Sequence, residues 1–104
     1  MILPHTLTLF YSVQADDPDG NPVRRPGEHG VEVAGFVQPF RARETGDGTD
    51  ELFAVYFDGE AAPPDAWSAA VYGGTRFEVS GPPQRYADPE QTVAYWRVLL
   101  RRAR

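Results

Sequence analysis

Two strand-like runs decide the fold of this chain: 31-VEVAGFV-37 and 52-LFAVYF-57. Val31, Val33 and Val37 fall on one face of the first run, which is typical of a half-buried strand. The second run is apolar on both faces, which favours a central strand. The insert between them, 41-RARETGDGTD-50, exceeds the roughly two to five residues of a usual hairpin loop. We therefore expect a long functional loop there.

The remaining sequence before the insert also carries clear local signals. Leu7 and Leu9 alternate with threonines, which predicts an opening strand. Residues 16–30 hold three prolines and three glycines and predict a long loop or an irregular arm. Gly35 indicates a bulge or a close backbone approach, and Pro39 is expected to end the first run.

The segment 17-DPDGN-21 faintly resembles a calcium loop. Its glycine falls one place early and no glutamate closes the loop, so an Asp19-Gly20 turn is the better interpretation.

The C-terminal half predicts a hairpin and a final strand. Gly73-Gly74 is a two-residue turn signal between Trp67–Tyr72 and the alternating run Thr75–Ser80. The segment from Asp88 could start a helix, because Asp is a good N-cap and Pro a good first helical residue. Residues 92–100 are instead rich in β-branched and aromatic side chains. We favour a final strand, with one helical turn before it left open.

Length and composition place these elements in one domain, residues 1–104. About six short strands predict an all-β fold, a small antiparallel β-barrel or sandwich with a long loop between the second and third strands. Hydrophobic residues make up 41% of the chain, enough for one modest core. No apolar run reaches the length of a membrane span, and the N-terminus lacks the pattern of a signal peptide.

Catalytic and metal chemistry find no support in the sequence. The chain has no cysteine, and neither His5 nor His29 has a second ligand at metal spacing. There is no nucleophile elbow and no phosphate-binding loop. Acidic pairs such as Glu44 and Asp47 lie on the expected loop, which cannot hold tuned carboxylates in place. We expect no enzyme activity, no catalytic residue, no cofactor and no metal.

Charge and aromatic content bear on possible partners. The net charge of −5 argues against a general nucleic-acid binder. An acidic body with the basic end 101-RRAR-104 could pair head to tail with a second copy. Six aromatic residues could form a base-stacking face, but a barrel core plus a protein interface is favoured; they are Trp67, Tyr72, Phe77, Tyr86, Tyr95 and Trp96.

Several segments occur in a characteristic order: 1-MILPHTLTL-9, 33-VAGFVQP-39, 65-DAW-67, 73-GGTRFEVSGPP-83 and 98-VLLRR-102. Their order, together with the chain length, resembles the head-to-tail stopper (head closure, head completion) proteins of long-tailed bacteriophages. Residues 41–65 match only in character, and residues 86–96 depart most from the pattern.

The resemblance implies a structural virion protein without catalysis. A small β-barrel would assemble into a six-fold or twelve-fold ring in the head–tail connector, or neck. The ring would lie below the portal and adaptor and above the tail terminator or tail tube. In that family the long loop points into the channel and helps to retain the packaged DNA, without reading its sequence. Here that channel-gating loop corresponds to Arg41, Arg43, Glu44, Gly46, Asp47, Gly48, Asp50 and Glu51.

Other predictions follow from the same resemblance. Gly46 and Gly48 would let the loop refold between closed and open states. We expect subunit or neighbour contacts at Trp67, Tyr72, Tyr86, Tyr95, Arg97, Arg101 and Arg102. The expected location is the virion, after assembly in the host cytoplasm, with no membrane involved. Two alternatives stay open: a tail terminator or other head–tail joining protein, and a small nucleic-acid-binding β-barrel.

Overall fold

The computed structural model describes residues 3–45, 48–90 and 93–103, with the backbone alone for residues 40–51. Within these ranges every regular element is a β-strand, which confirms the all-β prediction. The strands are β1 (His5–Phe10), β2 (Ser12–Asp16), β3 (Pro22–Pro26), β4 (Val31–Thr45), β5 (Gly48–Asp58), β6 (Ala69–Tyr72), β7 (Thr75–Val79), β8 (Gln84–Ala87) and β9 (Ala94–Arg102). No described segment forms a helix long and apolar enough to cross a membrane.

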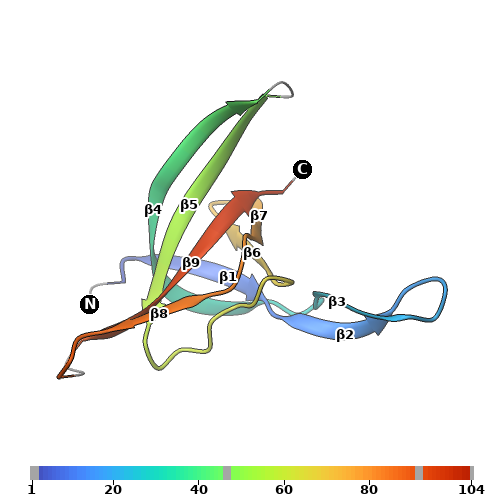
Figure 1. The fold of residues 1–104 in the computed structure, drawn as a ribbon, viewed down its shortest axis with the longest axis horizontal. Coiled ribbons are helices and arrows are strands. Elements are labelled where there is room, and N and C mark those ends of the chain that lie inside the picture. The colour runs from blue at the N-terminus through green and yellow to red at the C-terminus, as the bar shows by residue number, and fades with distance from the viewer. Residues whose placement is uncertain (1–2, 46–47, 91–92, 104) are drawn as a thin grey trace.

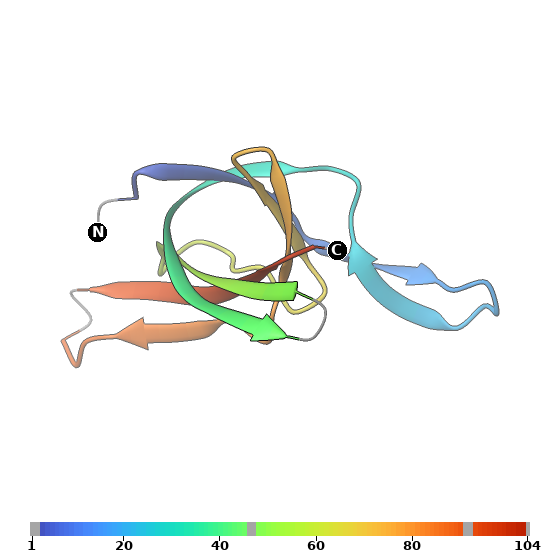
Figure 2. The same ribbon diagram turned by 90° about the horizontal axis from the view of Figure 1, so that it is seen from above.

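Six antiparallel strands close into a barrel in the order β5-β4-β1-β6-β7-β9 (Figures 1 and 2). The barrel closes where β5 pairs with β9, from Leu52 opposite Arg101 to Asp58 opposite Tyr95. Strand β8 adds to the start of β9, and β2 with β3 forms a separate two-stranded sheet that projects from one side. The predicted barrel is confirmed, although the structure has more strands than the expected six.

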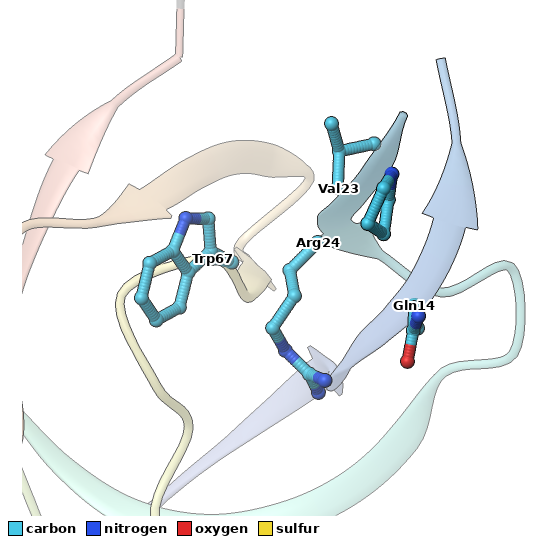
Figure 3. Close-up of a pocket in the computed structure, with 5 residues that line it drawn as sticks. Gln14, Val23, Arg24 and Trp67 are labelled. Atoms are coloured by element: carbon cyan, nitrogen blue, oxygen red, sulfur yellow. The ribbon is translucent and has the colours of Figure 1, made fainter. Parts of the chain in front are cut away.

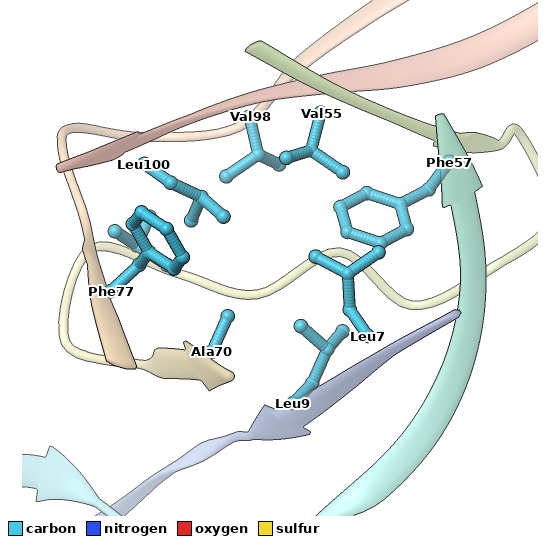
Figure 4. Close-up of a cluster of buried hydrophobic side chains, with 9 residues drawn as sticks. Leu7, Leu9, Val55, Phe57, Ala70, Phe77, Val98 and Leu100 are labelled. Atoms are coloured by element: carbon cyan, nitrogen blue, oxygen red, sulfur yellow. The ribbon is translucent and has the colours of Figure 1, made fainter. Parts of the chain in front are cut away.

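The barrel interior is filled by a buried cluster from β1, β5, β6, β7 and β9 (Figure 4), and Val33 and Val37 of β4 pack against it. Leu7 and Leu9 are fully buried, as the alternation of β1 predicts. The buried cluster comprises Leu7, Leu9, Val55, Phe57, Ala70, Phe77, Val79, Val98 and Leu100. Because its members come from both halves of the chain, the core joins distant strands into one packed unit.

Two glycine predictions are confirmed. At Gly35 a Cβ atom would lie 3.0 Å from Leu7 Cδ1 and 3.3 Å from the Tyr56 carbonyl oxygen, so this strand does approach its neighbours closely. Gly73 and Gly74 have φ of 59° and 79°, and they connect the paired Tyr72 and Thr75. Positive φ at both positions is typical of a type I′ hairpin turn.

The prediction of a long loop at residues 41–50 is wrong. β4 and β5 continue as a paired ladder in which Arg41 lies opposite Leu52, Arg43 opposite Asp50 and Glu44 opposite Thr49. Pro39 does not end the strand; the register shifts just after it, between Pro39 and Arg41. A ladder needs backbone hydrogen bonds and no apolar face, so a hairpin that leaves the core can be polar throughout.

Two further expectations need correction. The expected loop or irregular arm at residues 16–30 is largely part of a regular hairpin, because Ser12–Asp16 pairs with Pro22–Pro26. The expected turn at its tip is present, since Gly20 N–H donates to the Asp17 carbonyl at 2.9 Å. At the C-terminal end, Asp88 does not begin a helix in the described residues 88–90; its N–H donates to the Val93 carbonyl and joins β8 to β9. The predicted final strand is confirmed as β9.

Candidate functional site

No metal site is present among the described residues, because they hold no cluster of three or more potential ligands. The Nδ1 atom of His5 accepts a hydrogen bond from the Val37 N–H at 3.0 Å, and its ring packs edge-on against Tyr72. His5 therefore has a structural role that joins β1 to β4. His29 is exposed near the start of β4. The other candidate features among the described residues are surfaces and projections.

The first feature is the long β4–β5 hairpin. β1 pairs with β4 only as far as Gly35, and β9 pairs with β5 from Leu52 onward. Beyond Leu52 and its partner Arg41 the two strands pair only with each other, so their outer part stands clear of the barrel (Figure 1). Most of the candidate gating residues lie on this outer part, and Gly46 and Asp47 lie outside the described residues.

The second feature is the β2–β3 hairpin, which we call the arm. Its base is held by the carboxylate of Asp65, which accepts hydrogen bonds from Ser12 Oγ at 2.6 Å and Ser68 Oγ at 2.9 Å. The Trp67 N–H donates to the same carboxylate at 3.1 Å. Arg24 Nη2 donates to Ser12 Oγ at 2.8 Å, and Arg24 Nε lies 3.9 Å from Asp65 Oδ2. This network joins both arm strands to the barrel.

Ionisation of Asp65 reflects that network. Burial raises the pKa of the carboxyl. The hydrogen bonds from Ser12, Ser68 and the Trp67 N–H, together with the charge of Arg24, lower this pKa by more than burial raises it. The net pKa lies below the ordinary value. Nearby, Tyr11 Oη donates to the Ala62 carbonyl at 2.7 Å, and burial raises the pKa of this phenol. Asp65 is therefore charged at neutral pH and keeps the arm attached.

A groove of about 540 Å³ separates the arm from the loop before β6 (Figure 3). Trp67 lies on one side, and Gln14, Val23 and Arg24 lie on the other. Trp67 is 55% exposed and Val23 is 36% exposed. Large apolar side chains that stay this exposed mark a surface suited to a partner.

The third feature is a band of aromatic rings on the outside of the barrel. Phe36 contacts Tyr56, Tyr56 packs edge-on against Tyr95, and Tyr95 stacks on Tyr86 at 5.3 Å between ring centroids. These residues lie on β4, β5, β9 and β8 in that order. Phe36 and Tyr86 are 37% and 41% exposed. We call Phe36, Tyr56, Tyr95 and Tyr86 the aromatic band.

The residues predicted as contacts do not form one patch. Tyr86 and Tyr95 belong to the aromatic band, and Trp67 lies by the arm. Tyr72 and Arg102 line a small hollow at one end of the barrel, with Phe53 and Phe77. Arg101 donates to Glu78 at 3.1 Å across β7 and β9. Arg97 lies opposite Tyr56 and Gln84, between β5 and β8.

The six aromatic residues considered for base stacking are also dispersed. Phe77 is in the core, at 6% exposure, and Trp96 donates its indole N–H to the Gly59 carbonyl at 3.1 Å. A continuous stacking platform needs several ring faces open on one side. This arrangement does not provide one from those residues.

The sequence did not lead us to predict the strand pairing within the arm, or Phe36 and Tyr56 as members of the aromatic band. For the arm, the available signal was the Asp-Gly turn within 12-SVQADDPDGNPVRRP-26, flanked by two segments of equal length. For the band, the signal was Phe36 and Tyr56 on the faces opposite the expected core positions. Both signals were outweighed by local polarity and by the expectation of a loop.

No protein-family model matches this chain, and a search of curated proteins finds no match either. Among solved structures, it is similar to a chain of one described as "Virion of native gene transfer agent (GTA) particle". The TM-score is 0.63 and the sequences are 17% identical. The alignment covers 98% of this chain and 96% of the other. At this identity the likeness establishes a shared fold over nearly the full length of both chains.

Proposed function

We propose that this chain is a structural protein of a phage-like virion and acts in the head–tail connector as a stopper. The observation that carries the proposal is the likeness, along nearly the whole of both chains, to a chain of a gene transfer agent virion. The order of sequence segments, which resembles that of stopper proteins, supports the proposed role as a stopper.

The geometry is compatible with a ring that surrounds a channel. The barrel is a packed core with its rigid strands closed on themselves, and the β4–β5 hairpin extends beyond it. At about 3.3 Å per residue, the segment from Pro39 to Thr45 reaches ~20 Å. Copies arranged around an axis could direct these hairpins inward and narrow the opening between them.

The paired structure changes how such a gate would work. A loop could change state by refolding, but a hairpin held by a backbone ladder moves more readily as one body. The register shift between Pro39 and Arg41 lies where the ladder leaves the barrel. Because bulges bend and twist a strand, this position is suited to set the direction of the hairpin.

The proposed neighbours follow from the position of a stopper. The portal and adaptor would lie above the ring, and the tail terminator or tail tube below it. Packaged DNA would fill the channel without sequence-specific contacts, and the acidic chain would repel it rather than bind it. The ring would have six or twelve copies and would enter the virion after synthesis in the host cytoplasm.

Shortening the hairpin tests the gating role. Deletion of residues 45–49 should leave ring assembly intact and cause filled heads to lose DNA, measured as nuclease-sensitive DNA released from purified heads. Gly73→Asn is a matched control, because it changes another hairpin turn to the favourable Asn-Gly pair. Heads carrying the control should stay full. Full heads with the deletion would overturn the gating role.

A further inference from the structure

The two edges of the arm differ in their free hydrogen-bonding groups. Asp17 N–H donates to the Asn21 carbonyl, and Gly27 N–H donates to the Tyr11 carbonyl, both at 2.9 Å. Since hydrogen-bonded pairs alternate along an antiparallel ladder, the odd-numbered residues of β2 bond to β3. The even-numbered residues of both strands therefore direct their backbone groups outward.

Prolines block the outer edge of β3, and the outer edge of β2 is left open. The outward positions of β3 are Pro22, Arg24 and Pro26, and proline has no N–H to donate. On β2 the Ser12 N–H bonds to Ser68 Oγ at 3.1 Å. The two remaining outward positions, Gln14 and Asp16, can each offer an N–H and a carbonyl. No described strand pairs with this edge of β2.

Strand β8 has a matching open edge. Asp88 N–H donates to the Val93 carbonyl at 3.0 Å, so the even-numbered residues of β8 bond to β9. The outward positions are Arg85 and Ala87. Both are exposed, and among the described strands β8 pairs only with β9. An open strand edge is a template for pairing with another chain.

The two open edges lie at opposite ends of the molecule. The arm projects at one end of the long axis, and the β8–β9 hairpin extends toward the other end (Figures 1 and 2). The longest extent of the molecule is 49 Å. Edges at opposite ends favour contact between copies, and each copy can then use one edge on each side.

We propose that β2 of one copy adds to β8 of the next copy as an antiparallel strand, with Asp16 opposite Arg85 and Gln14 opposite Ala87. In this register all four residues exchange backbone hydrogen bonds with the neighbour. A shift of two residues in either direction places Pro83 or Pro89 opposite an outward residue of β2. Proline cannot complete the pair, so the flanking prolines select this register.

Side chains support the same register. It places the exposed carboxylate of Asp16 directly opposite the exposed guanidinium of Arg85. On the other face it places Ala15, which lies opposite Val23 within the arm, against Tyr86. Tyr86 already stacks on Tyr95, so the exposed apolar face of the arm would continue the aromatic band of the neighbour. One register thus pairs the open backbone groups, brings opposite charges together and covers the apolar face of the arm.

The contact joins two different surfaces and is therefore heterologous. Contacts of this type build closed rings when the rotation between copies closes, and open filaments when it does not. The inference rests in part on the proposed function, because that proposal supplies the reason for a ring. The pairing itself can be tested on the purified protein without reference to any particle.

Engineered cysteines provide the first test, since the natural chain contains none. In the proposed register Ala15 faces Tyr86 as a non-hydrogen-bonded pair, whose Cα atoms lie about 4.5 Å apart, within disulfide range. Chains with Ala15→Cys mixed with chains carrying Tyr86→Cys should form a mixed disulfide dimer on oxidation. The matched control, Gln14→Cys mixed with Tyr86→Cys, places the thiols on opposite faces and should form little dimer. Equal crosslinking in both mixtures, or none in the first, would overturn the register.

Charge reversal provides a second test that leaves Tyr86 intact. Asp16→Arg or Arg85→Asp should each weaken self-association roughly two- to fivefold, as expected for an exposed ion pair. Combining both reversals should restore it. Equilibrium sedimentation at high protein concentration measures the change. If neither variant alters self-association, or the combination does not recover it, the proposed contact is wrong.

The outcomes separate this inference from the proposed function. A ring that forms without the Ala15–Tyr86 crosslink would overturn the strand contact and leave the virion role standing. A specific crosslink in a chain absent from purified particles would support the strand contact and overturn the virion role. A homodimer joined through two β8 edges does not use Asp16, so it would persist in Asp16→Arg. Persistence of the dimer in that variant would also overturn the proposed contact.

Discussion

Removal of the Asp65 carboxylate should loosen the arm from the barrel. In Asp65→Ala, the hydroxyls of Ser12 and Ser68 and the N–H of Trp67 all lose their acceptor. Hydrogen bonds to a charged group are each worth about 1.5–3 kcal/mol. The Asp65 side chain is 41% exposed, so water replaces part of this loss. We expect the free energy of unfolding to fall by about 1–2 kcal/mol.

Two assays can measure this effect. A domain of this size changes its Tm by about 4–8 °C per kcal/mol, so thermal unfolding should shift by ~5–15 °C. Hydrogen exchange should also accelerate at the amides of Ser12 and Trp67, which the network holds directly. Barrel amides such as those of β5 should change only through the global loss of stability.

The matched control is Asp19→Ala, which removes an equal charge from the tip of the arm. The described residues provide no hydrogen bond to the Asp19 carboxylate, and this residue is exposed. It should unfold within about 0.5 kcal/mol of the natural chain. If Asp65→Ala is no less stable than Asp19→Ala, then the hydrogen-bond network of Asp65 does not anchor the arm.

Three further predictions concern stability. Phe57→Ala should lower the free energy of unfolding by about 3–5 kcal/mol in urea denaturation, because Phe57 is 1% exposed in the core; a loss below about 1 kcal/mol would contradict that packing. Gly59→Ala should destabilise the β5–β9 closure, because a Cβ there would lie 2.7–2.9 Å from atoms of Ala94. We expect Gly59→Ala to have a lower Tm. An unchanged Tm would contradict this prediction, because it would show that the backbone shifts at little cost in free energy. Since the folded-state pKa of Asp65 is lowered, its stabilisation is complete above the ordinary carboxyl pKa of about 3.9 and is lost as pH falls through the folded value. The stability difference between Asp65→Ala and the natural chain should therefore narrow in acid, measured by urea titrations across pH 2–6, and a constant difference would contradict the lowered pKa.

Much of the barrel could be predicted because its strands carry a period of two. Leu7 and Leu9 on β1, and Val33 with Gly35 on β4, alternate with less buried residues as a half-buried strand requires. The Gly73-Gly74 turn was equally readable, because a type I′ turn needs positive φ at both positions. These features depend only on neighbours in sequence.

The hairpins that leave the barrel could not be predicted by the same reasoning. The outer part of β4 and β5 and the whole arm are held mainly by backbone hydrogen bonds, which leave no periodic mark on the side chains. A better signal was Gly46-Asp47, a dipeptide common in two-residue hairpin turns, which separates the paired Thr45 and Gly48.

Closure of the barrel was also beyond the local sequence. It depends on pairing between β5 and β9, where Leu52 lies opposite Arg101. Pairs this distant in sequence leave no local pattern, and a sandwich would have used the same strands. The aromatic band could not be predicted for a related reason, because its rings meet only after the β4–β5 and β8–β9 pairs come together.

We propose that copies of this chain form a ring in the neck of a phage-like particle. Averaged electron-microscopy images of purified particles that carry the chain test it most directly. We predict a closed ring of barrels between head and tail, with the β4–β5 hairpins directed toward the axis. Particles whose neck lacks this chain, or rings whose hairpins point away from the channel, would contradict the account.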